Sequence, residues 1–391
     1  MQPTSDSVRA RRPTRLTRAS VVCAALLILA SSLSACSSPA AVPVTTVTVP
    51  TVPVPTVSTP KTLAVTYLHR YVTSDGRVVR WDQGGDTVSE GQGYGLLLAV
   101  AARQAATFAS LWTWTKDNLI QPDGLPAYLW ANGAVVGSGS ATDADLITAW
   151  ALVLGAKVFG DPSYLRAARS VANAILVNET VIAGGRIELV AGPWARNAPY
   201  PVDPSYFSPQ AMTALAVATH DDRWSQLGTN SQQLVADLQD SGASQSLPPD
   251  WALLQTTGTI AASPAPSGGV PPSYGLDAQR LPVWYAADCT VSGRTLSAND
   301  WSIIGGLAGS GAYGSYSLTG TPRVSYTNDL GLVAAAASAD AARQLARGKT
   351  LLALAQHGFT ESNYYGDSWV ALGTVLLTSS LLSSCPPAPA T

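Results

Sequence analysis

Segments whose apolar residues follow helical spacing recur along most of this chain, and this recurrence limits the folds open to it. Such runs cover residues 94–102, 146–159, 164–176, 209–219, 231–238, 329–345 and 369–382. Strand signals are short and fall at residues 77–81 and 185–190. Helices that return roughly every 25 to 30 residues, joined by long aromatic loops, predict an all-α barrel of helical hairpins with minor strands. Another all-α fold stays open, because periodicity alone does not separate the two.

The N-terminal segment predicts export. Five arginines within residues 9–18 precede an apolar run at residues 21–30, which is too short for a stable membrane anchor. Residues 33–36, Leu-Ser-Ala-Cys, then resemble a bacterial lipobox, in which Cys36 is lipidated after cleavage. An ordinary signal peptide that happens to contain a cysteine is the alternative. We therefore expect a protein held at the outer face of the cell membrane or in the cell envelope.

The chain divides into four predicted segments. These are a lipoprotein signal peptide (residues 1–35), a tether rich in Pro, Thr, Val and Ser (36–61), one large folded domain (62–385) and a short tail (386–391). With 46% hydrophobic and 12% charged residues, the chain can bury a large core. A net charge of −2 argues against nucleic acid as a partner.

Cysteine and histidine are too sparse to suggest a metal site. Cys23 is expected to be lost with the signal peptide and Cys36 to be lipidated, which leaves Cys289 and Cys385. In an exported protein these two are candidates for a disulfide, with free thiols as the alternative. The three histidines are scattered singly. We expect no metal and no other cofactor.

Three carboxylates in three separate motifs are the candidate catalytic groups. Glu90 lies in the stretch SEGQGYG, Asp143 in SATDADL and Asp277 in YGLDAQR. A pair of carboxylates held at a fixed separation is the machinery of glycoside hydrolysis, and a third can tune or position the pair. Because the motifs are far apart in the sequence, the fold has to bring them together.

Each carboxylate also has a structural interpretation. Glu90 fits a capping box, Asp143 lies at a helix start, and Asp277 could cap a short turn. The two interpretations are compatible, because a helix N-terminus also fixes a carboxyl group rigidly. It lowers the pKa, which suits a base, whereas a general acid needs the opposite effect from burial or from a neighbouring negative charge. Asp143 could supply that charge to Glu90.

Tryptophan and tyrosine are abundant relative to phenylalanine. The chain has 11 Trp and 14 Tyr but 4 Phe, and a flat ring with a polar tip suits stacking on sugars. Trp81, Trp130, Trp194 and Trp284 are expected in the loops that flank the three motifs and are candidates for sugar contact, with ordinary packing as the alternative. Trp150, inside a helical run, is expected in the core.

At these motifs the chain resembles glycoside hydrolase family 8. The stretch SEGQGYG is similar to the family's acid motif, ATDAD to its signature stretch and DAQR to its base motif, in the same order. Within the family, the likeness is to exported endoglucanases of bacterial cellulose-synthesis systems. Further similar pieces lie at residues 125–130, 203–207, 247–251 and 364–369.

The resemblance implies an (α/α)6 barrel and inverting hydrolysis of β-1,4-linked sugars. It implies that Glu90 is the general acid, that Asp277 is the base that activates water, and that Asp143 holds the distorted sugar beside the bond. The residues expected to contact or support the substrate are Tyr94, Trp130, Tyr206, Arg280 and Trp284.

The expected protein is a monomeric endo-β-1,4-glucanase acting on a β-linked polysaccharide or oligosaccharide. The same scaffold acting on chitosan, xylan or mixed-linkage glucan is the alternative within enzymes, and the Pro-, Gly- and Ser-rich loop at residues 261–272 leaves substrate length and type open. A non-catalytic glycan-binding lipoprotein is the alternative from another class. It has no need of both an acid and a base.

Overall fold

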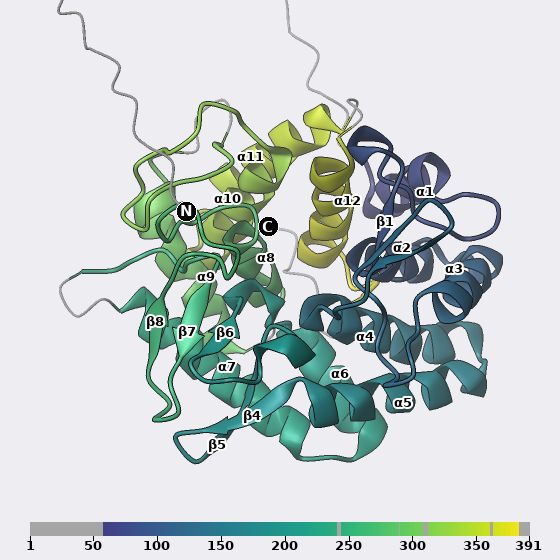
Figure 1. Ribbon diagram of the computed structural model, residues 1–391. Helices are drawn as coiled ribbons and strands as arrows, with labels where there is room; N and C mark the ends of the chain where they lie inside the picture. Colours follow the sequence, from purple (N-terminus) through teal and green to yellow (C-terminus); the bar gives the residue numbers. More distant parts are fainter. Residues whose placement is uncertain (1–57, 241–243, 289, 308–311, 360–362, 383–391) are drawn as a thin grey trace, which may run out of the picture. The chain divides into compact units, whose positions relative to one another are not determined.

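The computed structural model describes residues 58–240, 244–288, 290–307, 312–359 and 363–382. Within these ranges the chain forms twelve α-helices, arranged as an inner ring of six surrounded by an outer set of six (Figure 1). The helices alternate between the two rings along the chain, so that each outer helix leads into or out of a neighbouring inner one. This is an (α/α)6 barrel.

The inner ring consists of the even-numbered helices, each in contact with the next, and it closes because the last of them contacts the first. Every residue of the first inner helix except Glu90 is buried. Such helices are apolar on all sides, as expected for helices enclosed by others. The inner helices are α2 (Ser89–Ala102), α4 (Thr142–Phe159), α6 (Pro209–Thr219), α8 (Leu281–Ala286), α10 (Asp329–Ala341) and α12 (Tyr364–Thr378).

The outer helices bury one face each. In α5, for example, the buried positions Ala168, Val171, Ala172 and Ile175 follow helical spacing, and the remaining face is largely open to solvent. The outer helices are α1 (Pro60–Tyr71), α3 (Ala105–Asn118), α5 (Pro162–Asn178), α7 (Arg223–Gln239), α9 (Val291–Ile304) and α11 (Leu345–Gly358).

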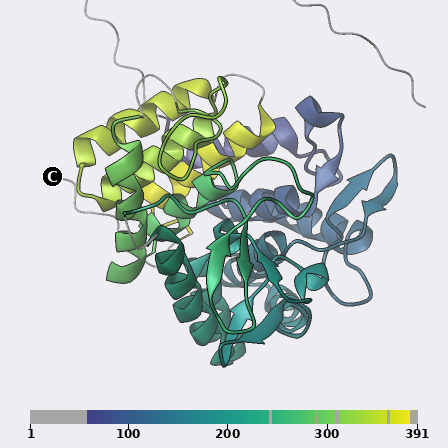
Figure 2. The same cartoon turned by 60° about the vertical axis from the view of Figure 1, so that its left-hand side comes forward.

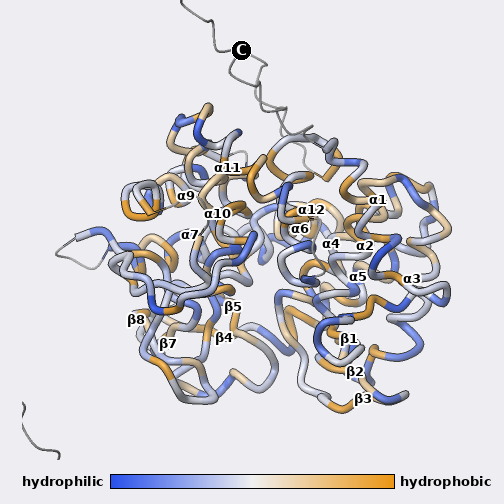
Figure 3. Tube along the Cα trace, turned by 90° about the horizontal axis from the view of Figure 1, so that it is seen from above, coloured by the Kyte–Doolittle hydropathy of each residue, from blue (hydrophilic) through white to orange (hydrophobic). Residues whose placement is uncertain are grey.

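Short antiparallel strands lie at one side of the helical ring in two groups (Figure 3). Figure 2 shows the same groups by colour, with the β2–β3 hairpin in blue and β7–β8 in green. The first group, β1 (Thr87–Val88), β2 (Leu129–Ala131) and β3 (Ala134–Gly137), forms one sheet. The second contains the hairpin of β4 (Thr180–Ala183) and β5 (Arg186–Leu189) and a sheet of β6 (Tyr200–Val202), β7 (Ala252–Leu254) and β8 (Ile260–Ala262).

Several predicted helices are confirmed, although their ends differ. The predictions for residues 164–176 and 209–219 correspond to α5 and α6, and the segment 146–159 corresponds to α4, which begins four residues earlier. The predicted helix 329–345 is divided into two, because α10 ends at Ala341 and Arg343 adopts a left-handed φ of 61°. A polar N-terminal turn hid the starts of α2 and α4, since the apolar pattern begins only after it.

The strand predictions were incomplete. Residues 185–190 correspond to β5, but residues 77–81 contribute only single bridges, at Val78 and Arg80. The strands β1 to β4 and β6 to β8 were missed, because segments of two to four residues carry too little alternation to detect.

The predictions for Cys36, Cys289 and Cys385 lie outside the described residues, as do the predicted signal peptide and most of the tether. Helix α1 begins at Pro60, slightly before the predicted start of the domain. In the ranges given above, no helix combines the length and apolar character needed to cross a membrane.

Candidate active site

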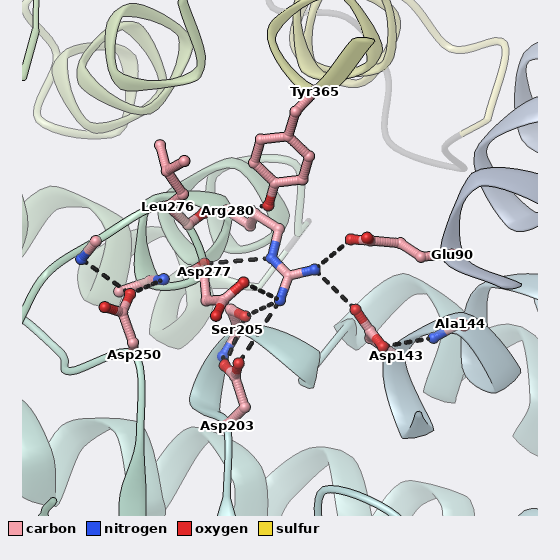
Figure 4. Close-up of polar contacts among 12 residues, drawn as sticks. Glu90, Asp143, Ala144, Asp203, Ser205, Asp250, Leu276, Asp277, Arg280 and Tyr365 are labelled. Carbon is pink, nitrogen blue, oxygen red and sulfur yellow. Dashed lines mark hydrogen bonds and ion pairs between the residues drawn. The ribbon is translucent and has the colours of Figure 1, made fainter. Parts of the chain in front are cut away.

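The guanidinium group of Arg280 joins the three candidate carboxylates. Its Nη1 atom lies 2.5 Å from Glu90 Oε1 and 2.7 Å from Asp143 Oδ2, and its Nη2 atom lies 3.3 Å from Asp277 Oδ1. Figure 4 shows Glu90 and Asp143 on one side of the guanidinium and Asp277 on the other. The fold therefore brings together the three motifs that are distant in the sequence.

The arrangement of the inner helices explains why these side chains lie together. Glu90 and Asp143 each occupy the second position of an inner helix, α2 and α4, and these helices are neighbours. Arg280 ends a short 3-10 helix, η4 (Ala278–Arg280), that runs directly into the inner helix α8. The starts of three inner helices thus deliver the four side chains to one place.

The capping interpretation is wrong for Glu90 and Asp277, whereas Asp143 does lie at a helix start. Neither α2 nor α4 has a side chain bonded at its N-cap, and Asp277 makes no capping hydrogen bond to η4. Asp143 Oδ1 accepts a hydrogen bond from the adjacent Ala144 N–H at 2.8 Å, while its Oδ2 faces Arg280. The carboxyl groups are therefore available to the site and are not used as N-terminal caps.

A second set of polar residues holds the other end of Arg280. Its Nη2 atom donates to Ser205 Oγ at 2.6 Å and lies 3.7 Å from Asp203 Oδ2. Ser205 in turn donates its backbone N–H and its hydroxyl to Asp203 Oδ1, at 2.9 and 2.6 Å. The Arg280 Cζ atom also lies 5.4 Å from the centroid of the Tyr206 ring. Arg280, with 3% of its side chain exposed, is thus fixed from both sides.

One cation among four carboxylates leaves an excess of negative charge. Burial raises the pKa of Glu90 to about 7, an effect that Arg280 opposes and the Asp143 charge reinforces. Burial likewise raises the pKa of Asp143, and raises that of Asp203 well above its usual range. Glu90 therefore holds a proton up to near neutral pH. Asp277 differs from the others because 41% of its side chain is exposed.

Two residues predicted to contact substrate belong to the protein interior instead. Tyr94 is fully buried and its hydroxyl donates a hydrogen bond to Glu90 Oε1, so it acts on Glu90 rather than on substrate. Trp284 lies in α8, not in a loop, with ring centroids of Trp150 and Trp369 at 6.2 and 5.2 Å. Sequence alone cannot tell which aromatic ring the fold encloses. Trp150 is in the core, as expected.

Other aromatic rings remain accessible. Trp130 on β2 is half-buried, with Arg77 Cζ 4.8 Å from its ring centroid. Trp194 is 46% exposed, and its ring centroid lies 6.2 Å from that of Trp251, which is 6.3 Å from that of Tyr206. This row leads from the exposed Trp194 to Tyr206, which contacts Arg280.

The candidate site contains residues to which the sequence assigned no role. They are Asp203, Ser205 and Asp250, together with Tyr365, whose hydroxyl donates to Leu276 O at 3.2 Å. All four lie in the motif-like stretches 203–207, 247–251 and 364–369, and this was the available signal. A cavity of about 210 Å³ beside Asp277 is lined by Asp250 and by the loop that includes Ser263 and Pro271. In the described part of the chain, no group of His, Cys, Asp and Glu residues could hold a metal ion.

The fold and the site together define an (α/α)6 barrel with a carboxylate cluster at the starts of its inner helices. The sequence-family model for glycosyl hydrolases family 8 matches residues 52–300, which is more than half of the chain. The chain belongs to this family. An endoglucanase of Cellulomonas uda is 30% identical over 225 residues, which make up 56% of this chain and 61% of that relative. The chain thus spans less than two thirds of the length of the first curated relatives it matches.

Solved structures share the fold. The endo-beta-1,4-glucanase of Acetobacter xylinum has a TM-score of 0.68 and 24% identity, with 81% of this chain and 98% of that chain covered. The beta-1,3-1,4-glucanase of Paenibacillus sp. X4 has a TM-score of 0.72 and 22% identity, with 84% and 92% covered. At these identities the likeness establishes the fold alone.

Proposed function

We propose that this domain is an inverting endo-β-1,4-glucanase that hydrolyses internal bonds of a β-glucan such as cellulose. The observation that carries the proposal is that Glu90 and Asp277 bind different nitrogens of one guanidinium, with the pKa of Glu90 raised to about 7 by burial. A protonated and an exposed carboxyl group facing one site are what an acid and a base require. The names of the relatives in Cellulomonas uda and Acetobacter xylinum support the substrate class.

In the proposed mechanism, Glu90 donates its proton to the leaving glycosidic oxygen. Asp277 accepts a proton from a water molecule that attacks the anomeric carbon from the opposite face, so the configuration inverts. The cavity of about 210 Å³ beside Asp277 supports this role, because it has room for water. Asp143, paired with Arg280, would hold the distorted sugar next to the bond.

Substitution of the acid and the base tests the proposal. Glu90→Gln and Asp277→Asn should each lower the release of reducing ends from soluble β-glucan by about 10²–10⁴-fold or more, with an unchanged circular dichroism spectrum. Glu188→Gln is a matched control. Glu188 is also buried, pairs with Arg186 at 3.2 Å, has its pKa raised to about 7 by burial, and lies outside the cluster. Full activity in either site variant would contradict the assignment.

The stereochemistry is tested separately. Proton NMR of a defined cello-oligosaccharide during hydrolysis should show the α-anomer as the first product, because single displacement inverts the β-bond. A β-anomer formed first would instead indicate a covalent intermediate and would exclude Asp277 as a base that activates water.

The substrate is tested with a panel of cellulose oligosaccharides, chitosan, xylan and mixed-linkage glucan. The Paenibacillus structure with the same fold is a beta-1,3-1,4-glucanase, so mixed-linkage glucan is the alternative with a specific observation in its favour. The expected result is fastest cleavage of uniformly β-1,4-linked glucan. Binding to these polymers without any hydrolysis would favour a glycan-binding lipoprotein.

We also propose that the chain is exported, lipidated at Cys36 and monomeric. The arginine-rich start, the short apolar run and the lipobox-like stretch support export and lipidation. Cells that express the full chain should incorporate labelled palmitate into it, and Cys36→Ser should abolish the label. Sedimentation of the soluble domain should give a single species near the monomer mass.

A further inference from the structure

We infer that Asp250 is a positioning residue for the base: it caps the short helix that follows Asp277 and so leaves the Asp277 carboxylate free to face water. The inference rests on the proposed role of Asp277 as the base. Asp250 lies on the opposite side of Asp277 from Arg280 in Figure 4.

The Asp250 carboxylate binds the backbone on both sides of Asp277. Its Oδ1 atom accepts hydrogen bonds from Gly275 N–H and Ala278 N–H, both at 2.9 Å. Its Oδ2 atom accepts one from the Ser273 hydroxyl at 3.0 Å, and Asp250 N–H donates to Ser273 O at 2.8 Å. One carboxyl group therefore holds the segment from Ser273 to Ala278, and Asp277 has little freedom to move.

Asp277 has no cap to provide. Asp250 accepts the first N–H of η4, that of Ala278, and the next one, Gln279 N–H, donates to Gly275 O at 3.0 Å. The first N–H groups of a helix have no partner within it, and usually the side chain of the preceding residue accepts one of them. Asp277 stands at that position before η4 and has a suitable side chain, yet it makes no such bond. Its φ of −72° and ψ of −55° are helical rather than extended, and the Ala278 N–H bonds to Asp250. A carboxylate used as a cap would be occupied, whereas Asp277 is left exposed.

Gly275 makes this arrangement sterically possible. A Cβ atom at Gly275 would clash with Asp250 Oδ2 and would lie 3.0 Å from Asp250 Cγ. A side chain at position 275 would therefore displace the carboxylate from the two N–H groups it accepts. Burial and the nearby Asp277 charge raise the pKa of Asp250 to about 6, so at neutral pH the group is largely ionised and a strong acceptor.

The first test is the kinetics of Asp250 variants of the soluble domain on a cello-oligosaccharide. Asp250→Ala should lower kcat by about 10²-fold, the scale of a small misplacement of a reacting group, with KM nearly unchanged. Asp250→Asn should keep kcat within about 10-fold of the wild type, because Asn and Asp are nearly equivalent caps. Wild-type kcat in Asp250→Ala would overturn the inference, provided that Asp277→Asn is inactive in the same assay.

An aryl β-glycoside with a dinitrophenolate leaving group shows which catalytic group Asp250 acts through. This leaving group departs without a proton, so Glu90→Gln should regain activity on it, whereas Asp277→Asn should not. Asp250→Ala should behave like Asp277→Asn. If Asp250→Ala regains activity as Glu90→Gln does, the inference is wrong, because the defect then lies on the acid side.

A variant at Gly275 covers the case in which Asp250→Ala fails to fold. Gly275→Ala alone should reproduce the loss of kcat. Where Asp250→Ala does fold, Gly275→Ala should add much less in that background, because the two changes remove the same contacts. Undiminished kcat in Gly275→Ala would overturn the inference. Asp161→Ala is the control: Asp161 caps α5 through Ser163 N–H at 2.8 Å, so its loss should lower the melting temperature without changing kcat.

The two proposals can fail separately. If Asp277→Asn retains full activity, the proposed function is wrong in its assignment of the base. If Asp277→Asn is inactive but Asp250→Ala and Gly275→Ala are fully active, only the positioning role is wrong.

Discussion

Arg280 supplies the positive charge with which the carboxylates of this site pair. It pairs with Glu90 and Asp143 through one nitrogen and with Asp277 through another, yet it carries only one positive charge. Burial disfavours several ionised carboxylates around one cation, and it raises the pKa of Glu90, Asp143 and Asp203. The result is a protonated Glu90 and an exposed Asp277, although both are carboxylic acids of similar intrinsic strength.

The pH dependence follows from the raised pKa of Glu90. A general acid works only while protonated, so kcat/KM should be retained below the folded-state pKa and should fall as the pH rises through about 7. The pH profile of kcat/KM on a cello-oligosaccharide checks this. An alkaline limb near the ordinary pKa of a glutamate, about 4.3, would contradict the prediction.

Tyr94 offers a second test at this scale. Its hydroxyl donates to the Glu90 carboxylate and so favours the ionised form. Tyr94→Phe should therefore raise the pKa of Glu90 and move the alkaline limb upward by about one pH unit, since a hydrogen bond to a charged group contributes about 1.5–3 kcal/mol. A limb that stays in place or moves to lower pH would rule out this role for Tyr94.

Helix α4 carries a second acidic residue in its first turn, Asp145, which lies outside the Arg280 cluster. Asp145 lies one residue beyond Ala144 in the first turn, fully buried close to Glu179, which follows α5. Burial raises the pKa of Glu179 to about 8 and, with the Glu179 charge, raises the pKa of Asp145 well above its usual range. At neutral pH this pair therefore keeps at least one proton. It lies at the start of α4, close to Asp143.

This pair should make stability fall with rising pH. An acid with a raised folded-state pKa stabilises the fold fully below its unfolded pKa, and that stability is lost as the pH rises through the folded value, about 8 for Glu179. Glu179→Gln cannot ionise, so its melting temperature should fall less between pH 5 and pH 8 than that of the wild type. Asp117→Asn, at a side chain that is 57% exposed on α3, is the control and should follow the wild type. Parallel curves for Glu179→Gln and the wild type would refute the prediction.

For the whole molecule, the closure of the ring depends on contacts between the first and last helices. Asp367 of α12 is buried, and its Oδ2 atom accepts hydrogen bonds from Arg70 of α1 and from the Tyr71 hydroxyl, the latter at 2.8 Å. Arg70 also donates to Phe359 O at 2.9 Å. These contacts join α1 to α12, nearly 300 residues apart in the sequence. They accompany the packing of α12 against α2, which closes the inner ring.

Arg70→Ala should lower the free energy of unfolding by about 1–3 kcal/mol, because it leaves the buried Asp367 carboxylate without its cation. Urea denaturation followed by tryptophan fluorescence measures the change. Arg294→Ala removes a more exposed pair, with Asp340 at 3.1 Å, and should cost at most about 1 kcal/mol. Equal losses in the two variants would show that closure does not depend on Arg70.

Much of the architecture could be predicted because local sequence patterns indicate it. Apolar residues at helical spacing indicated α4, α5 and α6, and the three motifs identified Glu90, Asp143 and Asp277. Short strands and polar first turns could not be recognised in this way, because a few residues carry too little periodicity. The same limit concealed the break between α10 and α11, where helix-forming residues continue on both sides.

The amino-acid sequence by itself determined the helical class, the family motifs and the candidate acid and base. Only the tertiary structure decided that Arg280 binds the carboxylates together, that Tyr94 and Trp284 are buried, and that Asp250 caps the helix after Asp277. The physical reason is that burial and charge depend on which distant segments meet. In this protein, the closure of the inner ring determines which distant segments come into contact.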